Sequence, residues 1–169
     1  MLIDNISKKQ ITIKIGELHA ASDPTIIYTL LGSCVAVCLY DRKNRLGGMN
    51  HIFLPGNCEG SSCTRYGDNA MEHLIKQISK LGGDRKYYQA KAFGGAHVIP
   101  SISREIGVGS KIVDYVIGYM KKERIEIIAH DFGGTKSRKV YFHTDTGKVF
   151  VKRIMHRGAE AAQPGRKQK

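Results

Sequence analysis

A cysteine after a turn of small residues, with a histidine 17 residues further along, has the clearest chemical potential in this sequence. Cys34 follows Gly32 and Ser33, and His51 follows a pair of glycines by a few residues. A thiol becomes a strong nucleophile at neutral pH when its pKa is lowered, or when a base, usually histidine, takes its proton. The small residues leave room for a substrate, and their backbone N–H groups could stabilise an oxyanion. The pattern predicts a cysteine–histidine hydrolase or transferase site.

Cys34 and His51 fall near matching ends of two expected strands. The apolar segments 34–40 and 46–54 flank a short polar turn, which is typical of a β-hairpin. In such a hairpin the start of the first strand lies beside the end of the second, within hydrogen-bond reach. The alternative is structural, because an isolated Cys and His are more often structural than catalytic. The kink before Cys34 favours the functional interpretation, since a packed core thiol does not require one.

Four cysteines also raise the question of a zinc site. Cys34 and Cys38 are four residues apart in an expected strand, and so about 13 Å apart on one face. Zn–S bonds of roughly 2.3 Å cannot join both to one ion. Cys58 and Cys63 lie in an expected loop that has no second pair of ligands. We therefore expect no metal site and reduced thiols, with Cys38 acting as a small core residue.

Two other histidines stand near glycine pairs that follow expected strands. His97 comes after Gly94 and Gly95, and His130 comes before Gly133 and Gly134. Glycines at such places either admit the close approach of another backbone or only form turns. Neither pair is followed by the Lys-Ser/Thr of a phosphate-binding loop. We expect structural or surface roles for both histidines.

The remaining pattern describes one α/β domain. Alternating or β-branched segments predict strands, and apolar residues at helical spacing predict two helices. The expected strands are 11–15, 25–30, 34–40, 46–54, 88–93, 125–129, 140–143 and 149–151, and the expected helices are 70–81 and 109–122. We predict a mixed, largely antiparallel sheet with two main helices over residues 1–156. Residues 157–169 are predicted to be a basic, disordered tail.

Composition limits the class of protein and its partners. The 169 residues are 41% hydrophobic, which is enough for one core. No apolar run could cross a bilayer and no signal sequence is evident, so we expect a cytoplasmic protein without an integral membrane segment. The net charge of +12 favours an acidic partner. A basic helix with interleaved aromatic residues is missing, so we expect no nucleic-acid partner; a gel shift would test this.

Around these residues the sequence resembles the CheD family of chemoreceptor glutamine deamidases. The segments that carry the resemblance surround the cysteine, the histidine and both glycine pairs. They are residues 31–38, 48–55, 65–70, 91–96, 131–134 with Arg138, and 146–149. The resemblance extends from about residue 15 to about residue 154, and it implies a single-domain α/β sandwich.

The resemblance also implies an activity. Members of this family convert particular glutamine side chains of bacterial chemoreceptors to glutamate without a cofactor. Cys34 matches the nucleophile and His51 the general base and acid, and the partners would be chemoreceptor cytoplasmic domains. Family members also bind a CheC-type phosphatase. The alternative is therefore a mainly regulatory partner of such a phosphatase, with weak or no deamidase activity.

A third catalytic residue is expected from the family, but this sequence departs from the pattern there. The family places a threonine six positions before the cysteine, where this chain has Tyr28, and the neighbouring threonine is Thr29. Adjacent residues of a strand point to opposite faces. Either the Tyr28 hydroxyl orients His51, or a bulge turns Thr29 inward, or the third group is dispensable. We take Thr29 as the third candidate.

Overall fold

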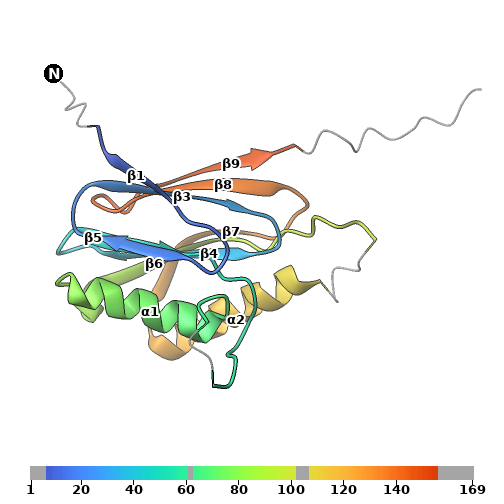
Figure 1. Cartoon of the computed structure of the whole chain (residues 1–169), viewed down its shortest axis with the longest axis horizontal. Helices are drawn as coiled ribbons and strands as arrows, with labels where there is room; N and C mark the ends of the chain where they lie inside the picture. Colours follow the sequence, from blue (N-terminus) through green and yellow to red (C-terminus); the bar gives the residue numbers. More distant parts are fainter. Residues whose placement is uncertain (1–6, 61–62, 102–106, 156–169) are drawn as a thin grey trace, which may run out of the picture.

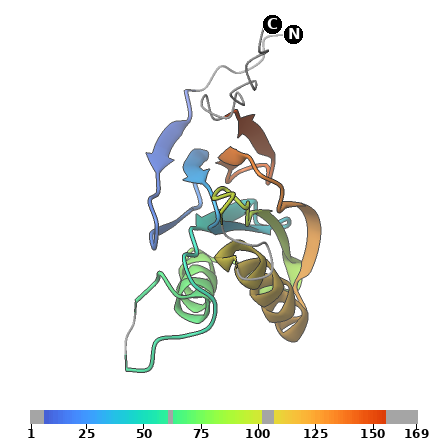
Figure 2. The same cartoon turned by 90° about the vertical axis from the view of Figure 1, so that its right-hand side faces the viewer.

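The computed structural model describes residues 7–60, 63–101 and 107–155. It consists of two stacked β-sheets with a layer of two helices against one of them (Figures 1 and 2). The tail predicted for residues 157–169 lies outside the described residues. Neither described helix is long and apolar enough to cross a membrane.

One sheet has four strands, in the order β1-β3-β8-β9. Its strands come from the two ends of the described chain: β1 (Lys9–Thr12), β3 (Thr25–Leu31), β8 (Ser137–His143) and β9 (Val149–Ile154). β1 pairs in parallel with β3, and the other neighbours are antiparallel. The predicted terminal hairpin is β8 with β9.

The second sheet has five strands, in the order β2-β5-β4-β6-β7. They are β2 (Leu18–Ala21), β4 (Val35–Asp41), β5 (Leu46–Asn50), β6 (Tyr88–Gly94) and β7 (Glu126–Phe132). Here β6 and β7 are parallel and the other pairs antiparallel. The helical elements are α1 (Gly67–Lys80), the short 3-10 helix η1 (Arg85–Tyr87) and α2 (Val108–Glu123), and α2 connects the two parallel strands.

The central strand β4 separates two apolar cores. Val35, Val37 and Leu39 pack toward the helices. Cys34 and Cys38 face the other sheet, where they meet side chains such as Phe142 and Leu31. Because β4 is buried on both faces, its sequence is a continuous apolar run rather than an alternating one.

The predicted single α/β domain, its mixed and largely antiparallel pairing and both helices are confirmed. Several bounds differ from the expected ones, and three of the differences concern the strands around Cys34 and His51. The short strand β2 was not predicted, and β1 ends early because a hydrogen-bonded turn joins Lys14 and Glu17. The strand predicted over 46–54 ends at Asn50, whose side chain accepts the Val37 N–H (3.0 Å) in place of a backbone carbonyl.

Candidate active site

Cys34 lies at the end of the turn between β3 and β4, immediately before β4. Its side chain faces the space between the two sheets and is 6% exposed. The same strand buries Val35 completely on the helix side. The alternation of β4 therefore directs the Cys34 thiol into the inter-sheet layer, at the end where that layer meets the turn.

His51 is brought to the same face by the hairpin of β4 and β5. Val35 and Ile52 form an antiparallel bridge with N···O distances of 3.2 and 2.8 Å. Cys34 and His51 each precede one of these paired residues, so they are diagonal neighbours on the inter-sheet face. Such diagonal neighbours on adjacent strands lie about 7–8 Å apart, within reach of a long side chain. The predicted hairpin pairing is confirmed.

Thr29 reaches the site from the opposite sheet. Its hydroxyl lies 2.8 Å from His51 Nδ1 and donates to the Ile13 carbonyl oxygen, also at 2.8 Å. A hydroxyl has one proton to donate, so the bond to Ile13 leaves its oxygen to accept a hydrogen from Nδ1. His51 therefore carries its proton on Nδ1, and Nε2 presents a lone pair. Nε2 is buried and has no hydrogen-bond partner among the described residues.

Tyr28 faces the other way. Its ring packs against Tyr141 on the neighbouring strand, with centroids 5.0 Å apart. Thr29 is fully buried between the sheets. Regular alternation along β3 thus brings Thr29 to His51 without a bulge, and it places Tyr28 on the outer face.

Burial makes the cysteine and the histidine neutral at pH 7. Desolvation raises the pKa of the Cys34 thiol to about 11. Desolvation also lowers the pKa of His51 to about 4, although the Glu17 carboxylate opposes this. A thiol is activated either by a lowered pKa or by a base that takes its proton, and this site has the groups for the second way: a neutral thiol and a neutral imidazole on the same face.

The turn before Cys34 is fixed by hydrogen bonds that the backbone carbonyl groups of Gly32 and Cys34 accept. The Gly95 N–H donates to the Cys34 oxygen (2.9 Å), and the Ala96 N–H donates to the Gly32 oxygen (3.0 Å). Gly94 has φ +117°, and a Cβ there would stand 2.1 Å from the Cys34 oxygen, so glycine is required. The N–H groups of Ser33 and Cys34 donate to no backbone carbonyl within the described ranges.

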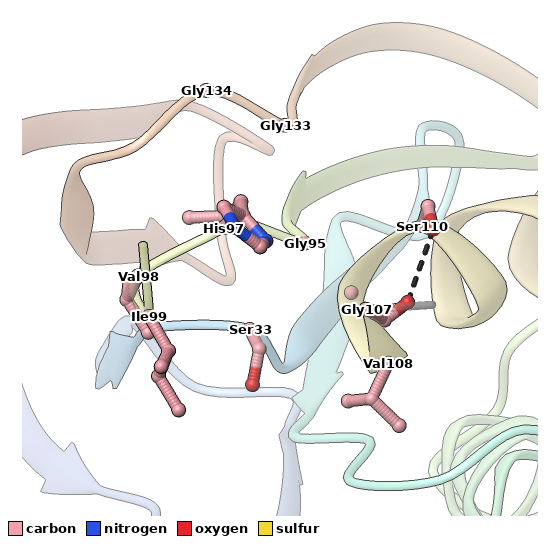
Figure 3. A pocket seen from close by; sticks show the side chains of 12 residues that line it. Ser33, Gly95, His97, Val98, Ile99, Gly107, Val108, Ser110, Gly133 and Gly134 are labelled. Atoms are coloured by element: carbon pink, nitrogen blue, oxygen red, sulfur yellow. Dashed lines mark hydrogen bonds between the residues drawn. The ribbon is translucent and has the colours of Figure 1, made fainter. Parts of the chain in front are cut away.

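A cavity of about 490 Å³ opens beside this turn (Figure 3). Ser33 forms one wall, and residues of three other segments form the rest. They are residues 95–99, residues 107–110, and Gly133 with Gly134. His97 projects into this space (Figure 3). Gly133 and Gly134 thus share the cavity wall with Ser33 and Gly95, and the backbone that approaches Gly94 is the Cys34 carbonyl.

Two contributions to the site were not predicted. The segment from Ile13 to Glu17 forms hydrogen bonds with both Thr29 and His51. The Ile13 carbonyl oxygen accepts from the Thr29 hydroxyl, and the Glu17 carbonyl oxygen accepts from the His51 backbone N–H at 3.1 Å. No motif in the sequence signals this contact.

Nowhere in the described ranges do three or more His, Cys, Asp or Glu side chains gather as metal ligands.

Fold and site together define an α/β sandwich with a buried cysteine–histidine–threonine arrangement at one end of its inter-sheet layer. A family model described as "CheD chemotactic sensory transduction" matches residues 53–153. The chain belongs to the CheD family.

Several curated proteins are similar over most of the chain. A "probable chemoreceptor glutamine deamidase CheD 2" of Chromobacterium violaceum is 43% identical over 152 residues, covering 88% of this chain and 75% of the relative. A "probable chemoreceptor glutamine deamidase CheD" of Vibrio cholerae is 40% identical over 157 residues, 86% of this chain and 66% of the relative. One of Stenotrophomonas maltophilia is 45% identical over 135 residues, 79% and 68% of the two chains.

Proposed function

We propose that this protein is a chemoreceptor glutamine deamidase, a hydrolase that converts receptor glutamine side chains to glutamate. The observation that carries the proposal is the site between the sheets of a CheD-family chain. There the Thr29 hydroxyl meets His51 Nδ1 at 2.8 Å, and the buried Nε2 remains available on the face that Cys34 shares. The relatives named above bear the same activity in their names.

In the first half of the proposed reaction, Cys34 attacks the carboxamide carbon of the glutamine. His51 Nε2 takes the thiol proton as the S–C bond forms, and the amide oxygen becomes an oxyanion. The N–H groups of Ser33 and Cys34 are the donors closest in sequence to the attacking sulfur, and in this proposal they bind that oxyanion. The imidazolium then gives its proton to the amide nitrogen, and ammonia leaves a thioester on Cys34.

In the second half, water replaces ammonia. His51, neutral again, takes a proton from water, and the resulting hydroxide attacks the thioester carbon. Collapse of the intermediate expels the Cys34 sulfur, which recovers the proton from His51. The products are glutamate and the free thiol. Thr29 keeps the Nδ1 proton in place throughout, so that Nε2 faces the reacting atoms in both halves.

We propose that the substrate approaches through the cavity lined by Ser33, the residue directly before Cys34. Its walls are rich in glycine and small apolar side chains, so a polypeptide can approach the turn closely. The net charge of +12 suits an acidic substrate surface. We propose that the substrates are the cytoplasmic domains of chemoreceptors, and that the protein acts in the cytoplasm during chemotactic adaptation.

The proposal is tested with a chemoreceptor cytoplasmic fragment. Ammonia release is followed together with mass-spectrometric conversion of glutamine to glutamate, for the parent protein and for Cys34→Ala. We expect the parent to convert specific glutamines and Cys34→Ala to convert none. Conversion by Cys34→Ala at the parent rate would refute the assignment of the nucleophile, and no conversion by the parent would refute the function.

Binding to a CheC-type phosphatase stays a prediction from the family resemblance. A pull-down with such a phosphatase, using the parent and Cys34→Ala, separates this role from catalysis. Retained binding by an inactive Cys34→Ala would show that the two activities are independent.

A further inference from the structure

The Arg138 guanidinium is buried beside Gly133 and Gly134, here called the glycine loop, which borders the cavity. Arg138 lies on β8 and is 3% exposed. A buried charge is costly unless its donors find acceptors. Nε donates to Asp131 Oδ2 (3.0 Å), Nη2 to the Gly133 oxygen (2.6 Å) and Nη1 to the Lys136 oxygen (3.3 Å). The N–H groups of the planar guanidinium form a fork of donors, which joins a carboxylate of β7 to two carbonyl groups of the connection between β7 and β8.

Arg153 provides an internal comparison. It binds the same carboxylate of Asp131, through Nε at 3.2 Å and Nη2 at 2.8 Å, but it is 61% exposed. The Arg138 and Arg153 hydrogen bonds lower the pKa of Asp131 to about 2. Within the described residues, Arg153 donates to no carbonyl of the glycine loop. Two arginines therefore share one anion, and Arg138 also holds the loop.

From that loop a continuous series of backbone hydrogen bonds leads to the nucleophile. The Gly133 N–H donates to the Gly94 oxygen (2.9 Å), and the His97 N–H donates to the Gly134 oxygen (2.8 Å). Between these two bonds, the Gly95 and Ala96 N–H groups donate to the carbonyls of Cys34 and Gly32, as described above.

Three chain segments thus lie side by side: the glycine loop, residues 94–97 and the turn before Cys34. Figure 3 shows the glycine loop and Ser33 on opposite sides of His97. Gly133 and Gly134 both have positive φ, +75° and +71°, so L side chains there could not supply the same loop shape without strain.

We infer that Arg138 is a positioning residue of the active site, which fixes the backbone of the turn at Cys34 through the glycine loop and residues 94–97. The inference rests on the proposed function for its kinetic consequence but not for its structural one. A displacement of about 1 Å at a reacting group lowers a rate by up to about 100-fold. Loss of the fork therefore acts on the chemical step more than on binding.

The test compares Arg138→Lys with Arg153→Lys, which keep the positive charge but lose the fork. Steady-state deamidation of the receptor fragment gives kcat and KM, and hydrogen exchange gives the protection of the amides at residues 95–97. We expect Arg138→Lys to lower kcat by about 10- to 100-fold with KM changed less than about threefold, and to speed exchange at those amides. Arg153→Lys should stay within about twofold in kcat and leave exchange unchanged.

A purely structural role for Arg138 would behave differently. Ile78→Val, in the fully buried face of α1, lowers Tm but should leave kcat and the exchange at residues 95–97 as in the parent. If Arg138→Lys matches Arg153→Lys or Ile78→Val in both readouts, the inference is wrong. If it does not fold, Asp131→Asn replaces it, since this change removes the carboxylate that aims the fork. Unchanged exchange and kcat in Asp131→Asn would also overturn the inference.

The experiment distinguishes failure of the proposed function from failure of the positioning role of Arg138. A parent protein without deamidase activity refutes the proposed function. The exchange at residues 95–97 still decides whether Arg138 fixes the segment that holds the turn.

Discussion

Two cysteines on the same face of β4 have different surroundings, although they are only four residues apart. Cys34 stands before the strand, at the end of a turn whose Ser33 lines the cavity. Cys38 stands in the middle of the strand, 1% exposed, and burial strongly raises its pKa while Lys91 opposes this. Both thiols are protonated at neutral pH. The difference is that Cys34 lies beyond the end of the strand, directly after the cavity-lining Ser33, whereas Cys38 lies within the strand and is paired with Met49.

The comparison indicates that this site does not depend on a preformed thiolate. The protein buries both Cys34, the proposed nucleophile, and His51, the proposed base, and both are neutral as a result. The fold then positions these groups. The turn before β4 holds Cys34, the hairpin of β4 and β5 holds His51, and the Thr29 hydroxyl from the opposite sheet sets the tautomer of His51.

The largest expected effect separates the two cysteines directly. Cys34→Ser should lower kcat/KM for receptor deamidation by at least about 10³-fold, because a serine hydroxyl is a much poorer nucleophile beside a base of low pKa. Cys38→Ser should keep kcat/KM within about twofold. It should instead lower the free energy of unfolding by about 1–3 kcal/mol, because it buries a hydroxyl without an assured partner. Urea unfolding and the ammonia assay measure the two effects, and equal activity loss in both variants would contradict the comparison.

A smaller effect is expected from the residue that orients His51. Thr29→Val keeps the shape of the side chain but removes the acceptor for Nδ1–H, so we expect kcat/KM to fall on the order of 10²-fold at pH 7. Tyr28→Phe, the matched change on the adjacent residue, should remain within about twofold because Tyr28 lies on the outer face. An equal loss in the two variants, or a greater loss in Tyr28→Phe, would show that the orientation of His51 is set otherwise.

The smallest expected effect is on stability in acid. The pKa of His51 is about 4 in the folded protein, against an ordinary 6.5. Between pH 6.5 and pH 4, His51 therefore binds a proton in the unfolded chain but not in the folded protein. Stability therefore falls as pH decreases from about 6.5 to about 4, by about 1–3 kcal/mol for this residue.

His51→Gln lacks this contribution and is the matched variant. Urea midpoints for the parent and the variant at pH 7 and pH 4 isolate it, because the carboxylates titrate alike in both. An equal decrease of the urea midpoint from pH 7 to pH 4 in the parent and in His51→Gln would contradict a buried neutral His51.

Much of this arrangement could be predicted from the sequence, since it depends on local pattern. The hairpin that brings His51 toward Cys34 follows from two apolar segments around a polar turn. The two helices follow from the spacing of their apolar residues. β2 was missed because its sequence, Leu18–Ala21, is short and does not alternate, and its pairing with β5 is what makes it a strand.

The remainder depends on contacts between distant segments. Sequence alone left Tyr28 and Thr29 as alternatives, because alternation shows that they face opposite ways but not which face is inward. That face is set by β3 packing over the second sheet, with β8 from the other end of the chain as its neighbour. The same stacking of sheets brings Thr29 to His51, and it buries Arg138 beside the glycine loop.

The central claim is that His51 is a neutral base whose proton is held on Nδ1 by Thr29. Nitrogen-15 NMR of the labelled histidine side chain measures this in the intact protein, as a function of pH, for the parent and Thr29→Val. The account predicts that at pH 7 Nδ1 carries the proton and Nε2 does not, that His51 titrates at about pH 4, and that Thr29→Val disturbs the tautomer. A doubly protonated His51 at pH 7, or a proton held on Nε2, would contradict it.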